Sequence, residues 1–481
     1  MAIHIIDDLH PEDSAMLQAL YSRSPASVAS HLDKLKEQGS GKFMDSYYVG
    51  YGHASIGDCG STSIFIENVS MLVAKAIQDN PLYNGQEVST RYVDYSTQAF
   101  VSPQQRSLPF IEQGPTPQSV MPLYAGNGAF VDPYHHTKSD ALMERWRALY
   151  VATLPKLVAA LGRRYPFNPQ TSKSEKIWDN AIKARAFDIL RGYLPVGAST
   201  SLAWHTNLRQ LRDNLRRLAN HPLPEVRDTA QDIFQAALQK YPHSFNGTEL
   251  SGDDRYQDRD AYLKDPAQHY FDGTQSLTPA QIAQIMAGDV IVDDTCFNAA
   301  LCNKRHGQAL AERPKGGLLP RQTMECGVYT YYFALDFGSY RDLQRHRNAY
   351  CPIPLVVASH GMHPWYRGQI ESLLPDDAVA IASECDDIIA TVQALPDPYL
   401  NQYYLPMGLA QICQLTCALP ETLYIGELRS SQAVHATLRV VAQQMLQSVQ
   451  ARHPMANIYG DFEADKWSEK RGEQTITRKA S

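Results

Sequence analysis

The chain has 481 residues, and dividing this length by about 150 suggests roughly three domains. Its 44% hydrophobic and 20% charged residues are typical of a globular protein and exclude wholesale disorder. The net charge of −7, from 44 Lys and Arg against 51 Asp and Glu, argues against general nucleic-acid binding. A local Arg cluster could still bind a small anion. No apolar run reaches the roughly 18 residues of a membrane span, so we expect no membrane segment.

The start of the chain has neither a basic segment nor a long apolar run, so it does not resemble a secretory signal. Eight cysteines are few for this length, and no Cys-x-x-Cys pair occurs. These features predict a cytoplasmic protein with reduced thiols. Cys413 and Cys417 would be one turn apart on a helix, but no further Cys or His has metal-site spacing. We therefore expect a buried apolar face there and no metal site.

The first half of the chain predicts a mixture of strands and helices. In chain order we expect a strand over 3–6, a helix over 14–22, a strand over 61–69, a helix over 71–78, a loop or insertion over 98–135, and helices over 139–161, 175–190 and 206–219. Residues 244–275 are polar with weak apolar periodicity, which is typical of a linker.

The second half begins again with an apolar run. We expect that run over 290–292, then a strand over 328–335, helices over 338–347, 377–395, 405–419 and 430–452, and a frayed tail from Gly472. Both halves thus run strand, helix, strand, helix with a polar cluster, loop and long helices. This order indicates an internal duplication. Leu194-Pro195 and Leu405-Pro406, each following a Tyr and opening an expected helix, support it.

Two polar clusters could carry chemistry. The segment from Asn84 to Tyr92 sets small polar residues beside Arg91, which could present backbone N–H groups and a guanidinium to a phosphate; an ordinary surface turn is the alternative. In the segment 341–347, three Arg and a His lie close together. Arg341 and Arg345 would share one helix face and repel each other unless an anion sits among them. A solvated face with Asp342 as counter-ion is the alternative.

Glu87-Val88-Ser89-Thr90-Arg91-Tyr92 and Arg345-His346-Arg347 resemble two motifs of the flavin-dependent thymidylate synthases. In that family an Arg-His-Arg triplet and an Asn-Glu-x-Ser-Gly-Arg-Tyr stretch share one short segment, whereas here they stand in opposite halves. The resemblance implies an α+β protein with two tandem copies of the family's fold, each an antiparallel sheet flanked by long helices. The expected boundaries are residues 1–243 for the first repeat, 244–284 for a linker or insertion, and 285–481 for the second repeat.

The two copies have lost complementary parts of the family's pattern. The first keeps the Glu-x-Ser-x-Arg-Tyr stretch, with Thr90 in place of Gly, but has Gln78-Asp79-Asn80 at the triplet's place and Leu218 where the family has a late Arg. The second keeps the triplet but has Gln402 and Ala418 at two family positions. Residues of the first copy that match family positions are Ser55, Asp58, Glu87, Ser89, Arg91, Arg191 and Asn207; those of the second are Glu325, Arg345, His346, Arg347 and Arg429.

In the family, active sites lie between subunits of a homotetramer, so the resemblance implies one complete composite site where unlike repeats meet. It also implies a homodimer of this chain with two such sites, FAD as cofactor, and NADPH and methylenetetrahydrofolate as co-substrates that convert dUMP to dTMP. Arg345 and Arg429 would act on the base as catalytic residues. Substrate would be bound by Glu87, Ser89, Thr90, Arg91, Arg191 and Asp342, and flavin by Ser55, Asp58, Asn207, Glu325, His346 and Arg347.

Two departures leave the substrate open. Asp342 stands where the family has a Gln, and an ionised carboxylate only accepts hydrogen bonds. Thr90 adds a Cβ where a Gly allows positive φ or a close phosphate approach. The alternatives are the same scaffold acting on another pyrimidine nucleotide, and an inert nucleotide-binding relative. We expect neither a nucleic-acid nor a membrane partner.

Overall fold

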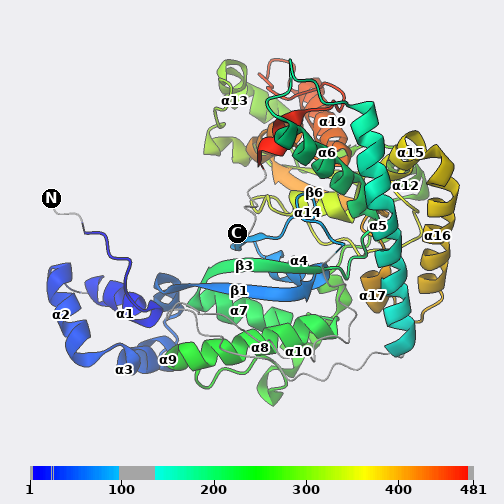
Figure 1. Ribbon diagram of the computed structural model, residues 1–481. Coiled ribbons are helices and arrows are strands. Elements are labelled where there is room, and N and C mark those ends of the chain that lie inside the picture. The colour runs from blue at the N-terminus through cyan, green and yellow to red at the C-terminus, as the bar shows by residue number, and fades with distance from the viewer. Residues whose placement is uncertain (1–3, 23, 25, 97–135, 475–481) are drawn as a thin grey trace. The chain divides into compact units, whose positions relative to one another are not determined.

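The computed structural model describes residues 4–22, 24, 26–96 and 136–474, and the expected loop over 98–135 lies outside them (Figure 1). The chain has an α+β fold with two small sheets of three strands each among the described residues. It divides into two compact units. Unit 1 contains the described residues up to Glu87 and the range Thr200–His269, and unit 2 contains those over 88–96, 136–199 and 270–474.

In unit 1 the strands β1 (Ser61–Ser70), β3 (Ser199–Asn207) and β2 (Asn84–Glu87) lie side by side in that order, and β2 and β3 are antiparallel. Figure 1 shows α7 (Leu208–Leu218) and α8 (Pro224–Lys240) beside this sheet. Helix α7 begins where the Asn207 side chain accepts a hydrogen bond from the Gln210 N–H at 2.8 Å. The other helices of unit 1 are α1 (Pro11–Tyr21), α2 (Val28–Gln38), α3 (Gly41–Phe43), α4 (Met71–Gln78), α9 (Pro242–Phe245) and α10 (Gln257–Lys264).

In unit 2 the sheet order is β4 (Ile291–Asp293), β5 (Val328–Asp336) and β6 (Ala410–Ala418), all antiparallel. Strands β5 and β6 pair along their full length, from Val328 opposite Ala418 to Asp336 opposite Ala410. Alternate residues of β5 are buried, as expected for a strand with one face in the core. The helices of unit 2 are α5 (His136–Arg164), α6 (Glu175–Leu190), α11 (Gly273–Ser276), α12 (Pro279–Met286), α13 (Ala299–Glu312), α14 (Phe337–Leu343), α15 (Pro364–Leu373), α16 (Pro375–Gln393), α17 (Pro398–Asn401), α18 (Leu419–Arg429) and α19 (Ala436–Arg452).

The order of elements repeats along the chain. In the first half β1 leads into α4 and β3 into α7, and in the second half β5 leads into α14 and β6 into α18. The Ser70 side chain caps α4 by accepting from the Val73 N–H, and the Asp336 side chain caps α14 by accepting from the Ser339 N–H. Aligning the two repeats on these caps makes residues 79–81 equivalent in position to the Arg345–Arg347 triplet. The sequence comparison placed the equivalent residues one position earlier, at 78–80.

The two Leu-Pro turns pair with each other inside unit 2. Four backbone hydrogen bonds of 2.8 Å join them as two symmetric sets: Val196 N–H to Leu405 O with Met407 N–H to Leu194 O, and Gly197 N–H to Tyr403 O with Gly408 N–H to Gly192 O. Each bond thus has a partner at the equivalent positions of the other repeat. Such self-complementary pairing is the mark of a two-fold contact between like elements, and it supports the tandem duplication.

Several expected elements are wrong. Residues 4–6 are not in a strand, and the segments after both Leu-Pro pairs form β3 and β6 instead of long helices. Strand β6 is buried along most of its length, and a short segment without apolar alternation shows no period that distinguishes a strand from a helix. Cys413 and Cys417 therefore lie on a strand.

The expected linker holds the short helices α9, α10 and α11, and the division between units at His269 falls inside it. The repeat boundaries themselves stay a prediction. The expected helix over 338–347 ends at Leu343, because the chain turns there to pair Tyr350 with Thr416 through two backbone hydrogen bonds of 2.8 Å. Arg341 and Arg345 therefore do not share one helical face.

Candidate functional site

A buried ion pair forms the centre of the candidate site in unit 2. Arg191, in the turn that ends α6, is 1% exposed, and its Nη2 donates to Ser339 Oγ at 2.5 Å and to Asp336 Oδ1 at 3.4 Å. Asp336 also accepts from Tyr366 Oη at 2.8 Å and from Thr437 Oγ1 at 2.6 Å. Burial opposes the charge of Arg191, but Tyr366 and Asp336 raise its pKa. The guanidinium is therefore held charged in one orientation.

The Ser89–Arg91 turn lies against the end of α6. Ser89 Oγ accepts from the Arg91 N–H at 3.3 Å, which shapes the turn. The Arg91 guanidinium binds Asp188 with Nε at 2.7 Å and Nη2 at 3.2 Å, a two-point contact. Arg471, near the end of the described chain, also pairs with Asp188. One buried carboxylate thus holds two guanidinium groups.

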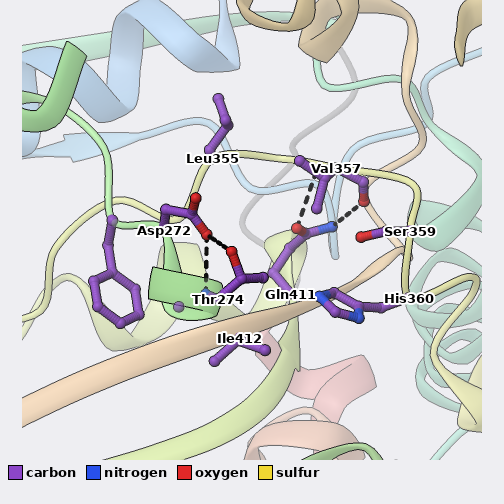
Figure 2. Close-up of a pocket in the computed structure, with 10 residues that line it drawn as sticks. Asp272, Thr274, Leu355, Val357, Ser359, His360, Gln411 and Ile412 are labelled. Carbon is purple, nitrogen blue, oxygen red and sulfur yellow. Dashed lines mark hydrogen bonds between the residues drawn. The ribbon is translucent and has the colours of Figure 1, made fainter. Parts of the chain in front are cut away.

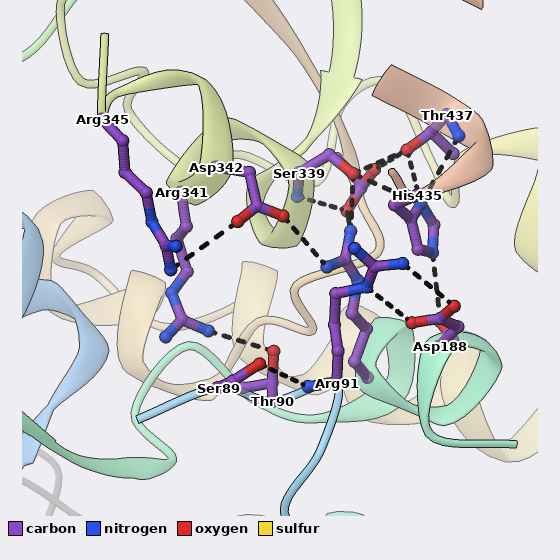
Figure 3. A network of polar contacts seen from close by, with 12 residues as sticks. Ser89, Thr90, Arg91, Asp188, Ser339, Arg341, Asp342, Arg345, His435 and Thr437 are labelled. Carbon is purple, nitrogen blue, oxygen red and sulfur yellow. Dashed lines mark hydrogen bonds and ion pairs between the residues drawn. The ribbon is translucent and has the colours of Figure 1, made fainter. Parts of the chain in front are cut away.

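Helix α14 of the second half reaches the same turn (Figure 3). Arg341 is 4% exposed and donates through Nη1 to Thr90 Oγ1 and through Nη2 to the Val88 carbonyl, both at 3.2 Å. The expected phosphate turn of the first repeat and the expected base-binding helix of the second therefore lie in contact within one chain. Arg341 has no assigned role among the sequence-based predictions, yet it makes this contact.

Asp342 lies among several guanidinium groups. Its carboxylate is 3.8 Å from Arg191 Nη1 and 3.7 Å from Arg345 Nη2, distances longer than a hydrogen bond (Figure 3). Burial raises the pKa of Asp342, but Arg345, Arg91 and the other cations outweigh it and lower the pKa to about 2. The residue is consequently an ionised, acceptor-only group at neutral pH.

His346 and Arg429 form a second contact of the cluster. Arg429 Nε donates to His346 Nε2 at 2.8 Å, and Arg429 Nη2 donates to the Asp342 carbonyl at 2.7 Å. Because a guanidinium only donates, His346 Nε2 must be unprotonated and its Nδ1 carries the hydrogen, facing Glu421 Oε1 at 3.8 Å. Burial and the charge of Arg429 lower the pKa of His346 to about 3, so the ring is neutral.

The cluster carries more positive than negative charge. Its carboxylates are fewer than its guanidinium groups even when Glu421 beside His346 is included. The guanidinium groups are those of Arg91, Arg191, Arg341, Arg345, Arg429 and Arg471, and the other carboxylates are those of Asp188, Asp336 and Asp342. Burial lowers the pKa of both Arg91 and Arg429. Such an excess is stabilised by an anion with several acceptor oxygens, such as a phosphate.

Other expected site residues lie in unit 1 and form their own contacts. Glu87 is paired with the buried Lys75 at 2.9 Å and accepts from Gln78 at 2.9 Å. By the matched caps, Lys75 is the counterpart of Arg341, so a buried ion pair occupies this place in the first repeat. Asn207 caps α7, Ser55 is exposed, and Asp58 pairs with Arg209 at 2.7 Å.

Besides His346, the expected flavin residues Glu325 and Arg347 lie in unit 2. Glu325 is 40% exposed, and its two oxygens lie 2.8 Å from Arg305 and 3.0 Å from His306. Arg305 and His306 lower the pKa of this carboxyl. Arg347 follows His346 in the turn after α14.

Sequence reasoning missed several residues that organise the cluster. Asp188 stands three residues before Arg191 on α6, and Asp336 ends an apolar strand just before a helix, the usual position of a capping residue. The positions of Asp188 and Asp336 in the sequence could therefore have identified both residues. His435 could not have been identified in this way, because its ring reaches the Asp188 carbonyl, at 3.2 Å, only through tertiary folding.

A separate cavity of about 240 Å³ lies beside β6 in unit 2 (Figure 2). Its polar lining is used internally: Gln411 binds both the N–H and the carbonyl of Val357, at 3.0 and 2.8 Å, and Asp272 accepts from the N–H and hydroxyl of Thr274. The volume is also below the roughly 300 Å³ at which ligand pockets usually begin. We assign this cavity no function.

In the part of the chain that the structure describes, no group of three or more His, Cys, Asp or Glu side chains could hold a metal ion. Likewise, none of the described helices combines the length and apolar character that crossing a bilayer requires.

The repeated fold and its arginine-rich cluster define an α+β protein of two like halves with a site of excess positive charge. Residues 4–243 match the family described as "Thymidylate synthase complementing protein", and the chain belongs to this family of flavin-dependent thymidylate synthases. Membership gives it a function related to thymidylate synthesis, within nucleotide biosynthesis.

Two curated relatives are similar over both halves. A "UPF0159 protein" of Chlamydia pneumoniae is 25% identical over 455 residues, which cover 86% of this chain and 78% of the relative. A "UPF0159 protein" of Thermoplasma acidophilum is 21% identical over 495 residues, covering 92% and 93%. The similarity therefore extends well beyond the 4–243 match.

Proposed function

We propose that the chain catalyses the reductive methylation of dUMP to dTMP, with FAD as cofactor and NADPH and methylenetetrahydrofolate as co-substrates. The reaction would take place in the cytoplasm, in a homodimer of this chain. One observation carries the proposal: the Ser89–Arg91 turn and Arg191 of the first repeat share a buried polar network with α14 of the second. The helix that precedes the Arg345–Arg347 triplet thus contacts the segment that holds the other half-motif.

The proposal assigns the phosphate of dUMP to the Ser89–Arg91 turn. The excess of guanidinium groups supports a doubly charged ligand, since a phosphate monoester has three strong acceptor oxygens. Arg91 is held by Asp188 and Arg191 by Asp336, so both guanidinium groups are oriented before a ligand arrives. Preorganised cations of this kind lose little entropy on binding.

Arg345 and Arg429 are assigned to the pyrimidine. Arg345 is 41% exposed and only loosely paired with Asp342, so its donors remain open to a ligand. Positive charge beside a uracil ring stabilises the electron-rich ring that attacks a one-carbon unit. The proposed reaction needs no cysteine nucleophile, and Cys351 is buried.

The residues present fit a flavin in their chemistry. In unit 2, His346 is neutral with Nδ1–H as a donor to a flavin acceptor, and Arg347 follows it in the same turn. Glu325 fits least well, because Arg305 and His306 already occupy its carboxylate. When bound, FAD supplies hydride transfer, a chemistry that no side chain provides.

A second candidate substrate follows from Asp342. An ionised carboxylate at this place only accepts hydrogen bonds, which favours a base that presents an amino group over one that presents a carbonyl. The same scaffold would then act on a cytosine nucleotide. Comparing dUMP, UMP and dCMP as triggers of reduced-flavin oxidation separates the two, and failure of dUMP to promote oxidation would contradict the leading proposal.

A matched pair of variants tests the site itself. Arg345 and Arg367 are 41% and 42% exposed, and each pairs with an Asp. Arg367 lies outside the cluster, on α15, and pairs with Asp386 of α16. We expect Arg345→Gln to lower dUMP-dependent flavin oxidation by about 100-fold or more, the scale of losing one electrostatic contact to the reacting group. Arg367→Gln should leave it unchanged. Equal activity of the two variants would remove Arg345 from the site.

A further inference from the structure

The last described residues form an arm that docks on the candidate site. We call residues 461–474 the C-terminal arm. Its backbone is held first by α19 and the residues before it: Arg439 donates to the Glu463 carbonyl at 2.9 Å, and Gln432 donates to the Ala464 carbonyl at 3.1 Å. The Trp467 ring then stacks on Tyr165, with centroids 4.6 Å apart and planes 6° from parallel. The arm therefore has a fixed path.

The end of the arm is anchored on α6 and the turn before it. Glu469 accepts from Ser172 Oγ at 2.6 Å, and Glu473 pairs with Lys173 at 2.6 Å. Gly472 is buried, and a Cβ there would collide with the Ile177 carbonyl, so the backbone approaches α6 as only glycine allows. The expectation of a frayed tail from Gly472 is therefore wrong for residues 472–474.

These anchors hold Arg471 at the Ser89–Arg91 turn. Its Nη1 pairs with Asp188, its Nη2 donates to the Arg91 carbonyl at 3.4 Å, and its guanidinium lies 5.3 Å from the Tyr92 ring centre. Arg91 occupies the same Asp188 carboxylate, so two cations share one anion. Arg471 Nε is buried and has no hydrogen-bond partner among the described residues.

The local charge balance at Arg471 calls for a further anion. Burial and the neighbouring Arg91 lower the pKa of Arg471 to about 9, far below that of an ordinary Arg. If Arg471 served only to neutralise Asp188, there would be no need for Arg91 to pair with the same carboxylate. A doubly charged anion near Arg91 would restore the balance and raise the pKa of Arg471 again.

We propose that Arg471 binds the phosphate group of the nucleotide together with Arg91, so that the C-terminal arm completes the phosphate site. This rests on the proposed function for its nucleotide, but only the phosphate monoester matters to the contact. The arm lies outside the segments that carried the family resemblance, so Arg471 is a binding residue that the motif comparison did not supply.

The test measures calorimetric affinity for dUMP and for deoxyuridine, which lacks the phosphate. Arg471→Gln should weaken dUMP binding about 10- to 100-fold, the usual effect of losing a charge-assisted hydrogen bond, and leave deoxyuridine within about twofold. Arg471→Lys should recover part of the loss, because it keeps the charge without the two-point geometry. The control Lys470→Gln, at the exposed neighbouring residue, should change neither affinity.

Other outcomes separate this inference from the proposed function. If Arg471→Gln weakens dUMP and deoxyuridine equally, or neither, the phosphate contact is refuted. If the unmodified chain binds no pyrimidine monophosphate but binds inorganic phosphate in an Arg471-dependent way, the contact stands and the proposed substrate falls. If the unmodified chain binds no phosphate of either kind, the inference falls.

Discussion

Asp188 offers the sharpest perturbation of the cluster, because its one carboxylate offsets Arg91 and Arg471. It is 2% exposed. Asp188→Asn keeps the shape but removes the charge, leaving two buried cations without their shared partner. Breaking a buried ion pair in this way costs about 3–5 kcal/mol. Since about 1 kcal/mol shifts the melting temperature of a 150–250-residue domain by about 2–4 °C, we expect a loss of about 6–20 °C.

The assay is thermal unfolding with and without dUMP. The nucleotide phosphate would supply the missing negative charge, so dUMP should raise the melting temperature of Asp188→Asn by more than that of the unmodified chain. The matched control is Asp386→Asn, because Asp386 is 54% exposed and pairs with Arg367 at 2.8 Å. A surface pair of this kind contributes about 0–1 kcal/mol. Equal melting temperatures for the two variants, with equal dUMP shifts, would refute the charge argument.

Three further predictions address stability, pH and specificity. A Cβ on Gly408 would lie 2.6 Å from the Gly192 carbonyl in the paired Leu-Pro turns, so Gly408→Ala should lower the free energy of unfolding in urea by about 1–3 kcal/mol. The control Gly368→Ala, on α15 with open space around it, should not lower it. Equal effects of the two variants would contradict the packing of the turns. The pKa of His346 is lowered to about 3 in the folded chain, against about 6.5 when unfolded, so the unfolded chain takes up the proton first and stability falls as the pH drops from about 6.5 toward 3. His346→Gln should flatten this decline by up to about 1.4 kcal/mol per pH unit, and an unchanged slope would show that the ring is not buried as a neutral group. Asp342→Gln should raise the ratio of dUMP to dCMP turnover about tenfold or more, and an unchanged ratio would remove Asp342 from base recognition.

The sequence predicted the parts of the fold that depend on local patterns. The helix over 71–78 and the helix over 175–190 have the predicted bounds, and β1 and β5 differ from prediction by a single residue at one end. Strand β6 was mistaken for a helix, since it is buried nearly throughout and shows no alternation. The pairing of the two Leu-Pro turns depends on contacts between distant segments and has no local signal.

The site was predictable to a similar degree. Motif resemblance selected Arg91, Arg191, Asp342, Arg345 and Arg429, all of which lie in or beside the cluster of unit 2. It did not find Arg471, because no family motif extends to the C-terminal arm. It also could not show that Asp188 and Asp336 hold the guanidinium groups in place, since those pairs join residues far apart in sequence.

The central proposal is that each chain forms one working site from unlike repeats, since the first repeat holds a buried Lys75–Glu87 pair at the place equivalent to Arg341 of the second. Titrating the purified, flavin-free chain with FAD tests this most directly. The account predicts saturation at one flavin per chain. Saturation at two flavins per chain would contradict it, because each repeat combination would then bind the cofactor.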